Sequence, residues 1–167
     1  MYDELTKGDV EKMEKEVEHR KLVLRKQLIE EVKEARAQGD LSENFEYYAA
    51  KKAKNQNESR IRYLENMIKT AKIISDDSAS DEVGINNTVT IYVEEDDVEE
   101  TYRIITTIRG NSLKGLISID SPLGKALLGH KVGDKVTVTV NENYSYDVVI
   151  RSIDKTNDDS NDEIRKF

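Results

Sequence analysis

The residues of this chain best suited to do chemistry are two carboxylates three positions apart, Asp40 and Glu43. They stand in the run RAQGDLSENFEYYAA, residues 36–50, where one helical pattern stops at Gly39 and another begins. Carboxylate oxygens suit Mg²⁺, but Mg²⁺ is rarely held by so few groups on an open surface, so the pair makes half of a metal site. The same spacing is that of a capping box, in which Asp40 accepts from backbone N–H groups of the second helix and Glu43 bonds back. Both interpretations stay open, and a capped tip would also be a rigid one.

Apolar residues on both sides of Gly39 recur at alternating spacings of three and four, which is the pattern of a coiled-coil seam. The first arm holds Val10, Met13, Val17, Leu24, Leu28, Val32 and Ala35, and the second holds Tyr47, Ala50, Ile61, Leu64, Ile68 and Ala71, with polar Lys54 and Asn57 between. The link is short, so the helices, to about residue 38 and over 41–74, must run antiparallel. At about 1.5 Å per residue the rod is on the order of 45 Å long, which is enough to reach into another molecule.

The tip also carries a family resemblance. Residues 39–44, GDLSEN, followed by Glu46-Tyr47 and by AAK at 49–51, are similar to the tip signature of the bacterial transcript cleavage factors GreA and GreB. The run SPLGKALLG at 121–129 resembles the C-terminal signature of the same family. The resemblance covers residues 1 to about 155. Two residues beside the acidic pair depart from the family pattern, Phe45 and Tyr48.

The resemblance implies a transcription elongation factor that inserts its coiled coil into the secondary channel of RNA polymerase. There it would stimulate the polymerase's own cleavage of backtracked RNA and rescue arrested complexes, without being an enzyme alone. Asp40 and Glu43 would be the catalytic carboxylates, sharing a Mg²⁺ with the polymerase active site. No cofactor is expected in isolation. The residues expected to support the tip are Gly39, Ser42, Asn44, Glu46 and Tyr47, of which Tyr47 stands on the seam and is better explained by packing.

A basic band is predicted partway down the hairpin. Helix 1 has no acid between Glu18 and Glu30, and helix 2 has none between Glu46 and Glu58. The antiparallel pairing places the basic residues of these two stretches side by side; they are Arg20, Lys21, Arg25, Lys26, Lys51 and Lys52. The band is either a solvated face, with Lys21 and Lys54 extending from the seam, or a guide for the RNA 3′ end, as the family resemblance implies.

Composition narrows the class of protein. The 167 residues allow one large or two small domains, and 36% charged with 6% aromatic residues indicate an elongated protein with small cores. There is no cysteine, no apolar run of membrane-spanning length and no signal-peptide core, so a soluble cytoplasmic protein is expected. The net charge of −8 argues against unaided binding to nucleic acid. The expected partners are therefore bacterial RNA polymerase, at its secondary channel and rim, and the RNA 3′ end within that complex. The factor itself is expected to be a monomer with no membrane partner.

The second half of the chain switches to the period of two that is typical of strands. We predict an α+β fold, with the two-helix coiled coil at 1–75, a linker at 76–83, and at 84–155 an antiparallel sheet with one short helix. The resemblance implies that this domain is FKBP-like and docks on polymerase through Ser121, Pro122 and Leu123. Those residues are also a plain helix start, with Ser121 as cap and Pro122 first in the helix. The polar tail at 156–167 is expected to be disordered.

Two other functions remain open. The protein could occupy the polymerase channel without cleaving, as a regulator or inhibitor, because Phe45 and Tyr48 alter the tip. It could also be an adaptor in which the hairpin is purely structural. Prolyl isomerase activity is not expected, since the sheet domain offers few aromatic residues to line a proline pocket. His19 and His130 lie in different predicted domains, so a zinc site is not expected either.

Overall fold

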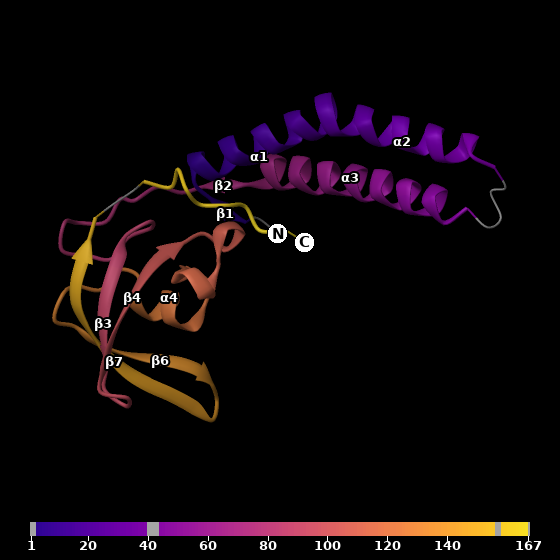
Figure 1. Cartoon of the computed structure of the whole chain (residues 1–167). Coiled ribbons are helices and arrows are strands. Elements are labelled where there is room, and N and C mark those ends of the chain that lie inside the picture. Colours follow the sequence, from indigo (N-terminus) through magenta and orange to yellow (C-terminus); the bar gives the residue numbers. More distant parts are fainter. Residues whose placement is uncertain (1–2, 40–43, 156–157, 167) are drawn as a thin grey trace. The chain divides into compact units, whose positions relative to one another are not determined.

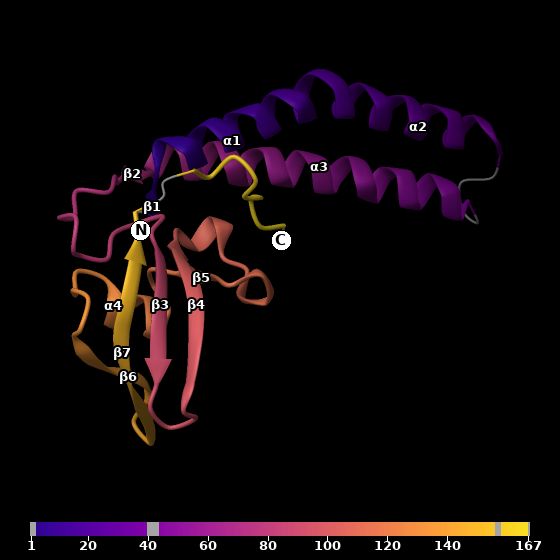
Figure 2. The ribbon, with the colours of Figure 1, turned by 60° about the vertical axis from the view of Figure 1, so that its left-hand side comes forward.

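The computed structural model describes residues 3–39, 44–155 and 158–166, and it divides into two compact units. One unit contains Val10–Lys72, and the other joins Glu4–Asp9 to Ile73–Phe167. Figures 1 and 2 show the first as a pair of helices and the second as a curled sheet with a short helix. The chain passes from the first unit to the second between Lys72 and Ile73. The assignment of Glu4–Asp9 to the sheet unit has no local signal in the sequence.

The hairpin consists of two long helical arms that lie side by side in both ribbon views (Figures 1 and 2). Its first arm is α1 (Lys7–His19), the π-helical segment η1 (Arg20–Leu24) and α2 (Arg25–Ala37), and its second arm is α3 (Phe45–Thr70). Every predicted seam residue is buried or half-buried, with Met13 and Leu64 fully inaccessible to solvent. The predicted antiparallel coiled coil is therefore confirmed. Among the described residues no helix is both long and apolar enough to cross a membrane.

The first helix begins with a capping box. The backbone N–H of Thr6 donates to the carboxylate of Asp9 at 2.9 Å, and the backbone N–H of Asp9 donates to the Thr6 hydroxyl at 3.2 Å. This reciprocal pair satisfies two N–H groups that the helix would otherwise leave without acceptors. Just before the helix, β1 (Glu4–Leu5) pairs with β2 (Lys72–Ile73) in a two-stranded sheet.

The second unit is a five-stranded sheet in the order β5-β4-β3-β7-β6. Its strands are β3 (Thr88–Val93), β4 (Val98–Ile105), β5 (Leu116–Ser118), β6 (Lys135–Asn141) and β7 (Tyr144–Asp154). They lie in the part of the chain where the period of two predicted strands. The expectation of a purely antiparallel sheet is wrong at one edge, where β5 runs parallel to β4. Two short 3₁₀ turns, η2 (Thr107–Arg109) and η3 (Ser112–Lys114), connect these strands and bring the chain back in the same direction.

The core of the sheet unit lies between one face of the sheet and α4 (Pro122–Leu127). Alternate residues of β3, namely Val89, Ile91 and Val93, point into this core and are buried. Leu127 of α4 is fully buried against them. The start of α4 is the predicted one, with Ser121 as N-cap and Pro122 first in the helix. The helix ends at Leu127, and Gly129 is in a left-handed conformation two residues later.

The described part of the tail, residues 158–166, makes contacts that its polar composition did not predict. The carboxylate of Asp162 accepts from Arg103 at 2.9 Å and from Arg109 at 2.7 Å, and it is nearly inaccessible to solvent. Arg109 also donates to Asp9 and, at 2.8 Å, to the side chain of Asn86. Three segments far apart in the sequence are thereby joined around the buried guanidinium of Arg109. The expectation of a disordered tail rested on its polar composition alone, and composition does not reveal such long-range ion pairs.

Candidate functional site at the hairpin tip

The register of the hairpin is fixed by ion pairs that cross between its arms. Arg25 donates twice to the carboxylate of Glu58, at 2.7 and 2.8 Å. Lys21 pairs with Glu65 at 3.0 Å, and Glu16 receives Arg60 at 2.9 Å. Because each pair joins a residue of one arm to a residue of the other, sliding one arm past the other would break all of them.

One polar residue of the seam, Asn57, is matched to a local irregularity in the first arm. Its side-chain oxygen accepts from the Arg20 guanidinium at 2.9 Å, and its side-chain nitrogen donates to the Arg20 carbonyl at 3.3 Å. Arg20 begins the π-helical segment, whose wider turn shifts the hydrogen-bonding pattern of the backbone. The sequence identified Asn57 as a seam residue but did not reveal the π-helical segment. A buried amide with both functions satisfied lets a polar residue occupy the seam without loss of register.

The two arms are tied together at the tip by Asn44. Its side-chain oxygen accepts from the backbone N–H of Tyr47 at 3.0 Å, which makes it the N-cap of α3. Its side-chain nitrogen donates to the carbonyl of Ala35 in the last turn of α2 at 2.6 Å. One side chain thus caps the second arm and holds it to the first. The interpretation of Asp40 and Glu43 as the capping box of this helix is wrong, since the helix starts at Phe45 and Asn44 caps it.

The acidic residues themselves, Asp40 and Glu43, and Ser42 between them lie outside the described residues. Gly39, the last described residue of the first arm, has a φ of 136°, a backbone conformation that favours glycine. Glu46 is exposed in the first turn of α3, where a negative charge is favourable for the helix dipole. Within the described residues no three His, Cys, Asp or Glu side chains form a group that could hold a metal ion.

Tyr47 is a packing residue, as the seam pattern indicated. It is buried, its hydroxyl accepts from Arg36 at 3.3 Å, and the Arg36 guanidinium lies over its ring at 5.4 Å from the centroid. The hydrogen bond from Arg36 holds the pKa of the Tyr47 phenol below its ordinary value. Arg36 was not among the predicted site residues, although its position next to the tip turn was visible in the sequence.

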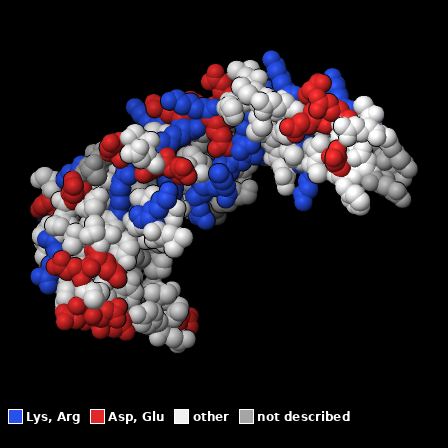
Figure 3. All heavy atoms as spheres, viewed as in Figure 1, with Lys and Arg blue, Asp and Glu red and all other residues white. Residues whose placement is uncertain are grey.

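The predicted basic band divides into two sets. Arg20, Lys21 and Arg25 are engaged with Asn57 or with acidic partners of the hairpin. The other three, Lys26, Lys51 and Lys52, are exposed and have no ion pair within the described part of the chain. Figure 3 shows the same mixture, with acidic and basic side chains interspersed over the hairpin. Only the second set is free to meet an external anion.

The predicted docking residues occupy the start of α4. The Ser121 hydroxyl accepts from the backbone N–H of Gly124 at 3.0 Å and donates to the Ser118 carbonyl at 2.6 Å. Pro122 is exposed, whereas Leu123 packs against the core of the sheet. A Cβ at Gly124 would lie 2.1 Å from the Ser118 carbonyl oxygen, so this position requires glycine. Of the three predicted residues, Pro122 offers the most surface to a partner.

Comparison with known proteins identifies the family. The family model for the transcription elongation factor N-terminal domain matches residues 4–73, and the model for the GreA/GreB C-terminal domain matches residues 76–155. The transcription elongation factor GreA of Bacillus subtilis (strain 168) is 46% identical over 134 residues, which cover 80% of this chain and 85% of that protein. The chain belongs to the GreA/GreB family of transcription elongation factors.

Other family members agree. GreA of Geobacillus kaustophilus (strain HTA426) is 48% identical over 135 residues, covering 80% of this chain and 85% of that protein. GreA of Streptococcus pneumoniae serotype 19F (strain G54) is 44% identical over 153 residues, covering 91% of this chain and 95% of that protein. Both halves of the GreA/GreB chain are therefore matched in their usual order, and the tail beyond residue 155 lies outside the matched domains.

Proposed function

We propose that this chain stimulates the intrinsic cleavage of backtracked RNA by bacterial RNA polymerase, with Asp40 and Glu43 as the carboxylates that act at the polymerase active site. Membership of the GreA/GreB family supports the general role in elongation. The observation that carries the specific role is the capping of α3 by Asn44. Because Asn44 supplies the cap, the two acids between Gly39 and Asn44 are not required to start the helix.

The hairpin supplies reach and position in this proposal. Its seam and its crossing ion pairs keep two thin arms in one register, and Asn44 holds the arms together next to the acidic residues. A tip held in this way needs little reorganisation when it meets the polymerase active site, which is how positioning lowers a reaction barrier. The hairpin enters the secondary channel, and Pro122 on the sheet unit contacts the rim. A Pro122→Asp variant is expected to bind polymerase more weakly, and unchanged affinity would remove this residue from the interface.

The carboxylates act on groups that polymerase provides. Two carboxylates complete a Mg²⁺ site only with further oxygen ligands, and these would come from the polymerase's own acidic residues. That Mg²⁺ would supply Lewis-acid activation of a water and charge stabilisation on the phosphodiester. Asp40 and Glu43 would help to hold the ion and would orient the attacking water. Lys26, Lys51 and Lys52 attract the phosphates of the extruded RNA segment.

A transcript cleavage assay on stalled polymerase complexes tests the proposal. Wild-type protein is expected to shorten the RNA, and Asp40→Ala and Glu43→Ala variants are expected to leave only the cleavage of polymerase alone while still binding the enzyme. Glu34→Ala is the matched control, because Glu34 is an exposed acid near the end of α2. Retained stimulation in both tip variants would contradict the proposed role of the acids.

A second function is favoured by one observation. Phe45 is 85% exposed and Tyr48 52% exposed, so two aromatic rings stand beside the acidic residues. If they obstruct the approach of the acids to the active site, the protein would occupy the channel and inhibit polymerase without cleaving RNA. The same assay separates the two functions, since inhibition alone would give binding with no shortening of the transcript.

A further inference from the structure

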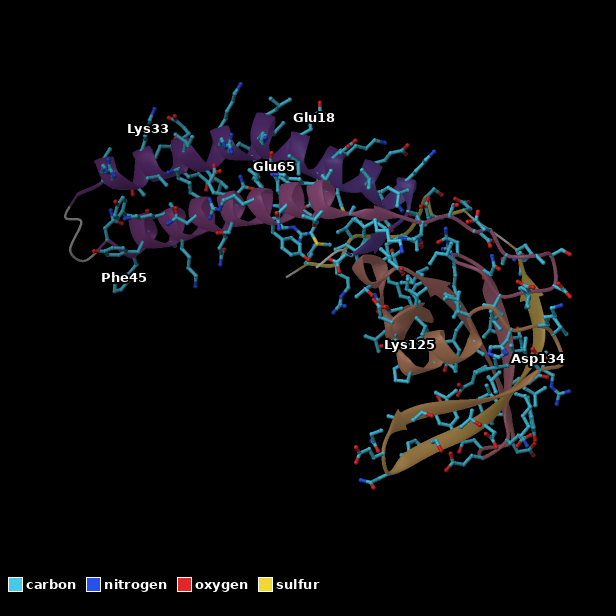
Figure 4. The ribbon with its side chains drawn as sticks, turned by 180° about the vertical axis from the view of Figure 1, so that it is seen from behind. Glu18, Lys33, Phe45, Glu65, Lys125 and Asp134 are labelled. Carbon is cyan, nitrogen blue, oxygen red and sulfur yellow. The ribbon has the colours of Figure 1, made fainter. Side chains whose placement is uncertain are left out.

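Two exposed aromatic residues and a lysine form a stripe on one face of α3 next to the tip. Phe45, Tyr48 and Lys52 follow the spacing of three and four that places side chains on one face of a helix. All three are exposed. Figure 4 shows Phe45 at the tip end of α3, with its side chain directed away from α2. Single exposed apolar residues are ordinary on protein surfaces, but here two aromatic residues one turn apart on the same helix face are both exposed.

The Tyr48 ring is positioned by contacts with neighbouring residues. Tyr48 meets the ring of Tyr47 edge to face, with 5.5 Å between the ring centroids. Tyr47 is itself buried and fixed by Arg36, which donates to its hydroxyl and covers its ring. The backbone N–H of Tyr47 is bonded to Asn44, the cap of the helix. Tyr48 therefore contacts a tyrosine that is itself held by Arg36 and Asn44. A side chain ordered in this way loses less conformational entropy when a ligand binds.

The positive charge of the lysines next to the stripe favours a negatively charged ligand. Between Glu46 and Glu58 the helix carries no acid, and Lys51 and Lys52 are exposed without an ion pair in the described part of the chain. Aromatic rings interleaved with cations are how proteins bind single-stranded nucleic acid, since bases stack on the rings while lysines meet the phosphates. Exposed rings followed along the helix by two exposed lysines fit this kind of ligand.

We propose that Phe45 and Tyr48 form a stacking platform for unpaired bases at the 3′ end of the backtracked RNA, with Lys51 and Lys52 contacting the adjoining phosphates. This proposal rests on the proposed function and adds to it a sequence-tolerant contact with the RNA bases. The platform would hold the extruded segment against the hairpin next to Asp40 and Glu43. Phe45 and Tyr48, the two departures from the family pattern, would thus bind the RNA substrate.

Binding to backtracked polymerase complexes tests the platform. All proteins carry Asp40→Asn and Glu43→Gln so that the RNA stays intact, and affinity is measured with RNA whose extruded nucleotides are either normal or abasic. Each stacked base is expected to contribute about tenfold in affinity. On normal RNA, Phe45→Ala/Tyr48→Ala should lose about tenfold in affinity for each base that stacks on a ring. On abasic RNA the variant should bind as tightly as its parent protein. Leu22→Ala is the control, because Leu22 is an apolar residue of the first arm that is 59% exposed, and it should leave both affinities unchanged.

Other outcomes overturn the proposal in different ways. Equal weakening on normal and abasic RNA would mean that the rings contact the wall of the polymerase instead of the bases. No weakening on either RNA would mean that they contact nothing in the complex. Absence of any binding by the parent protein would refute the proposed function itself, and the platform with it, whereas strong binding without a base-dependent effect would refute the platform alone.

Discussion

The hairpin and the sheet unit reach a defined structure by different means. The sheet surrounds a core in which residues such as Ile91, Leu127 and Ile150 are removed from solvent on all sides. The hairpin has a single apolar seam, and much of its specificity comes from polar partners across the seam, such as Asn57 and Glu58. The difference follows from shape, because two helices alone can bury only one stripe each. In the hairpin, register is the property that matters, since a shift would displace the tip.

The two units also use buried charge differently. The sheet unit encloses Arg109 completely, with Asp9 and Asp162 as its partners. The ion pairs of the hairpin remain partly exposed to solvent. Exposed pairs contribute little free energy, whereas breaking a buried pair leaves a charge without solvent or partner. Removing one partner of an ion pair should therefore lower the free energy of unfolding much more in the sheet unit than in the hairpin.

The largest effect is expected for Arg109→Met. This change leaves the buried carboxylate of Asp9 without its cation and should lower the free energy of unfolding by about 3–5 kcal/mol. Chemical denaturation of the full chain measures it. An Asp9→Asn/Arg109→Met double variant should recover part of the loss, because no unpaired charge then remains. A loss below about 1 kcal/mol in the single variant would show that the cluster is not essential.

A seam substitution should have the next largest effect. Leu64→Ala removes a fully buried side chain and should destabilise the hairpin by about 2–4 kcal/mol. Helical circular dichroism during denaturation reports it, and Ile73→Ala, at a half-exposed apolar position outside the seam, serves as the control. If both variants behave alike, the seam is not what holds the arms together.

The division of the basic band can be sharpened by charge reversal. Lys51→Glu/Lys52→Glu should reduce crosslinking of the hairpin to the RNA 3′ end in backtracked complexes severalfold, because these exposed lysines are available to phosphates. Lys21→Gln should change crosslinking much less, since Lys21 is engaged by Glu65. Equal losses in both variants would contradict the division into engaged and available residues.

The smallest effect on hairpin stability is expected from lowering the pH. Burial alone would raise the pKa of Glu16, but hydrogen bonds from Arg60 and Arg20 outweigh it and hold the pKa below its ordinary value of 4.5. A carboxyl group with a lowered pKa in the folded state stabilises the fold above its unfolded pKa and loses that contribution as pH falls through the folded value. Hairpin stability should therefore decline below about pH 4.5, and Glu16→Gln should make that decline shallower. An identical pH profile in the variant would remove Glu16 from the account.

Periodic features were predictable from the sequence, and features that depend on distant or competing groups were not. The seam, the strands and the start of α4 follow from repeated spacing or from the fixed preference of proline for the first turn of a helix. The choice of Asn44 as cap did not, because Asp40, Ser42 and Asn44 can all cap a helix and spacing alone does not decide among them. The Asp9–Arg109 pair joins residues a hundred positions apart, and no residue preference in the first arm identified the π-helical segment.

The central claim is that the tip acids help to hold a metal ion in the polymerase active site, and the Mg²⁺ dependence of cleavage tests it most directly. Wild-type protein should lower the Mg²⁺ concentration that gives half-maximal cleavage in a backtracked complex. The Asp40→Asn/Glu43→Gln variant, at equal occupancy of polymerase, should leave that concentration at the value of polymerase alone. The same shift in Mg²⁺ dependence with both proteins would contradict the account.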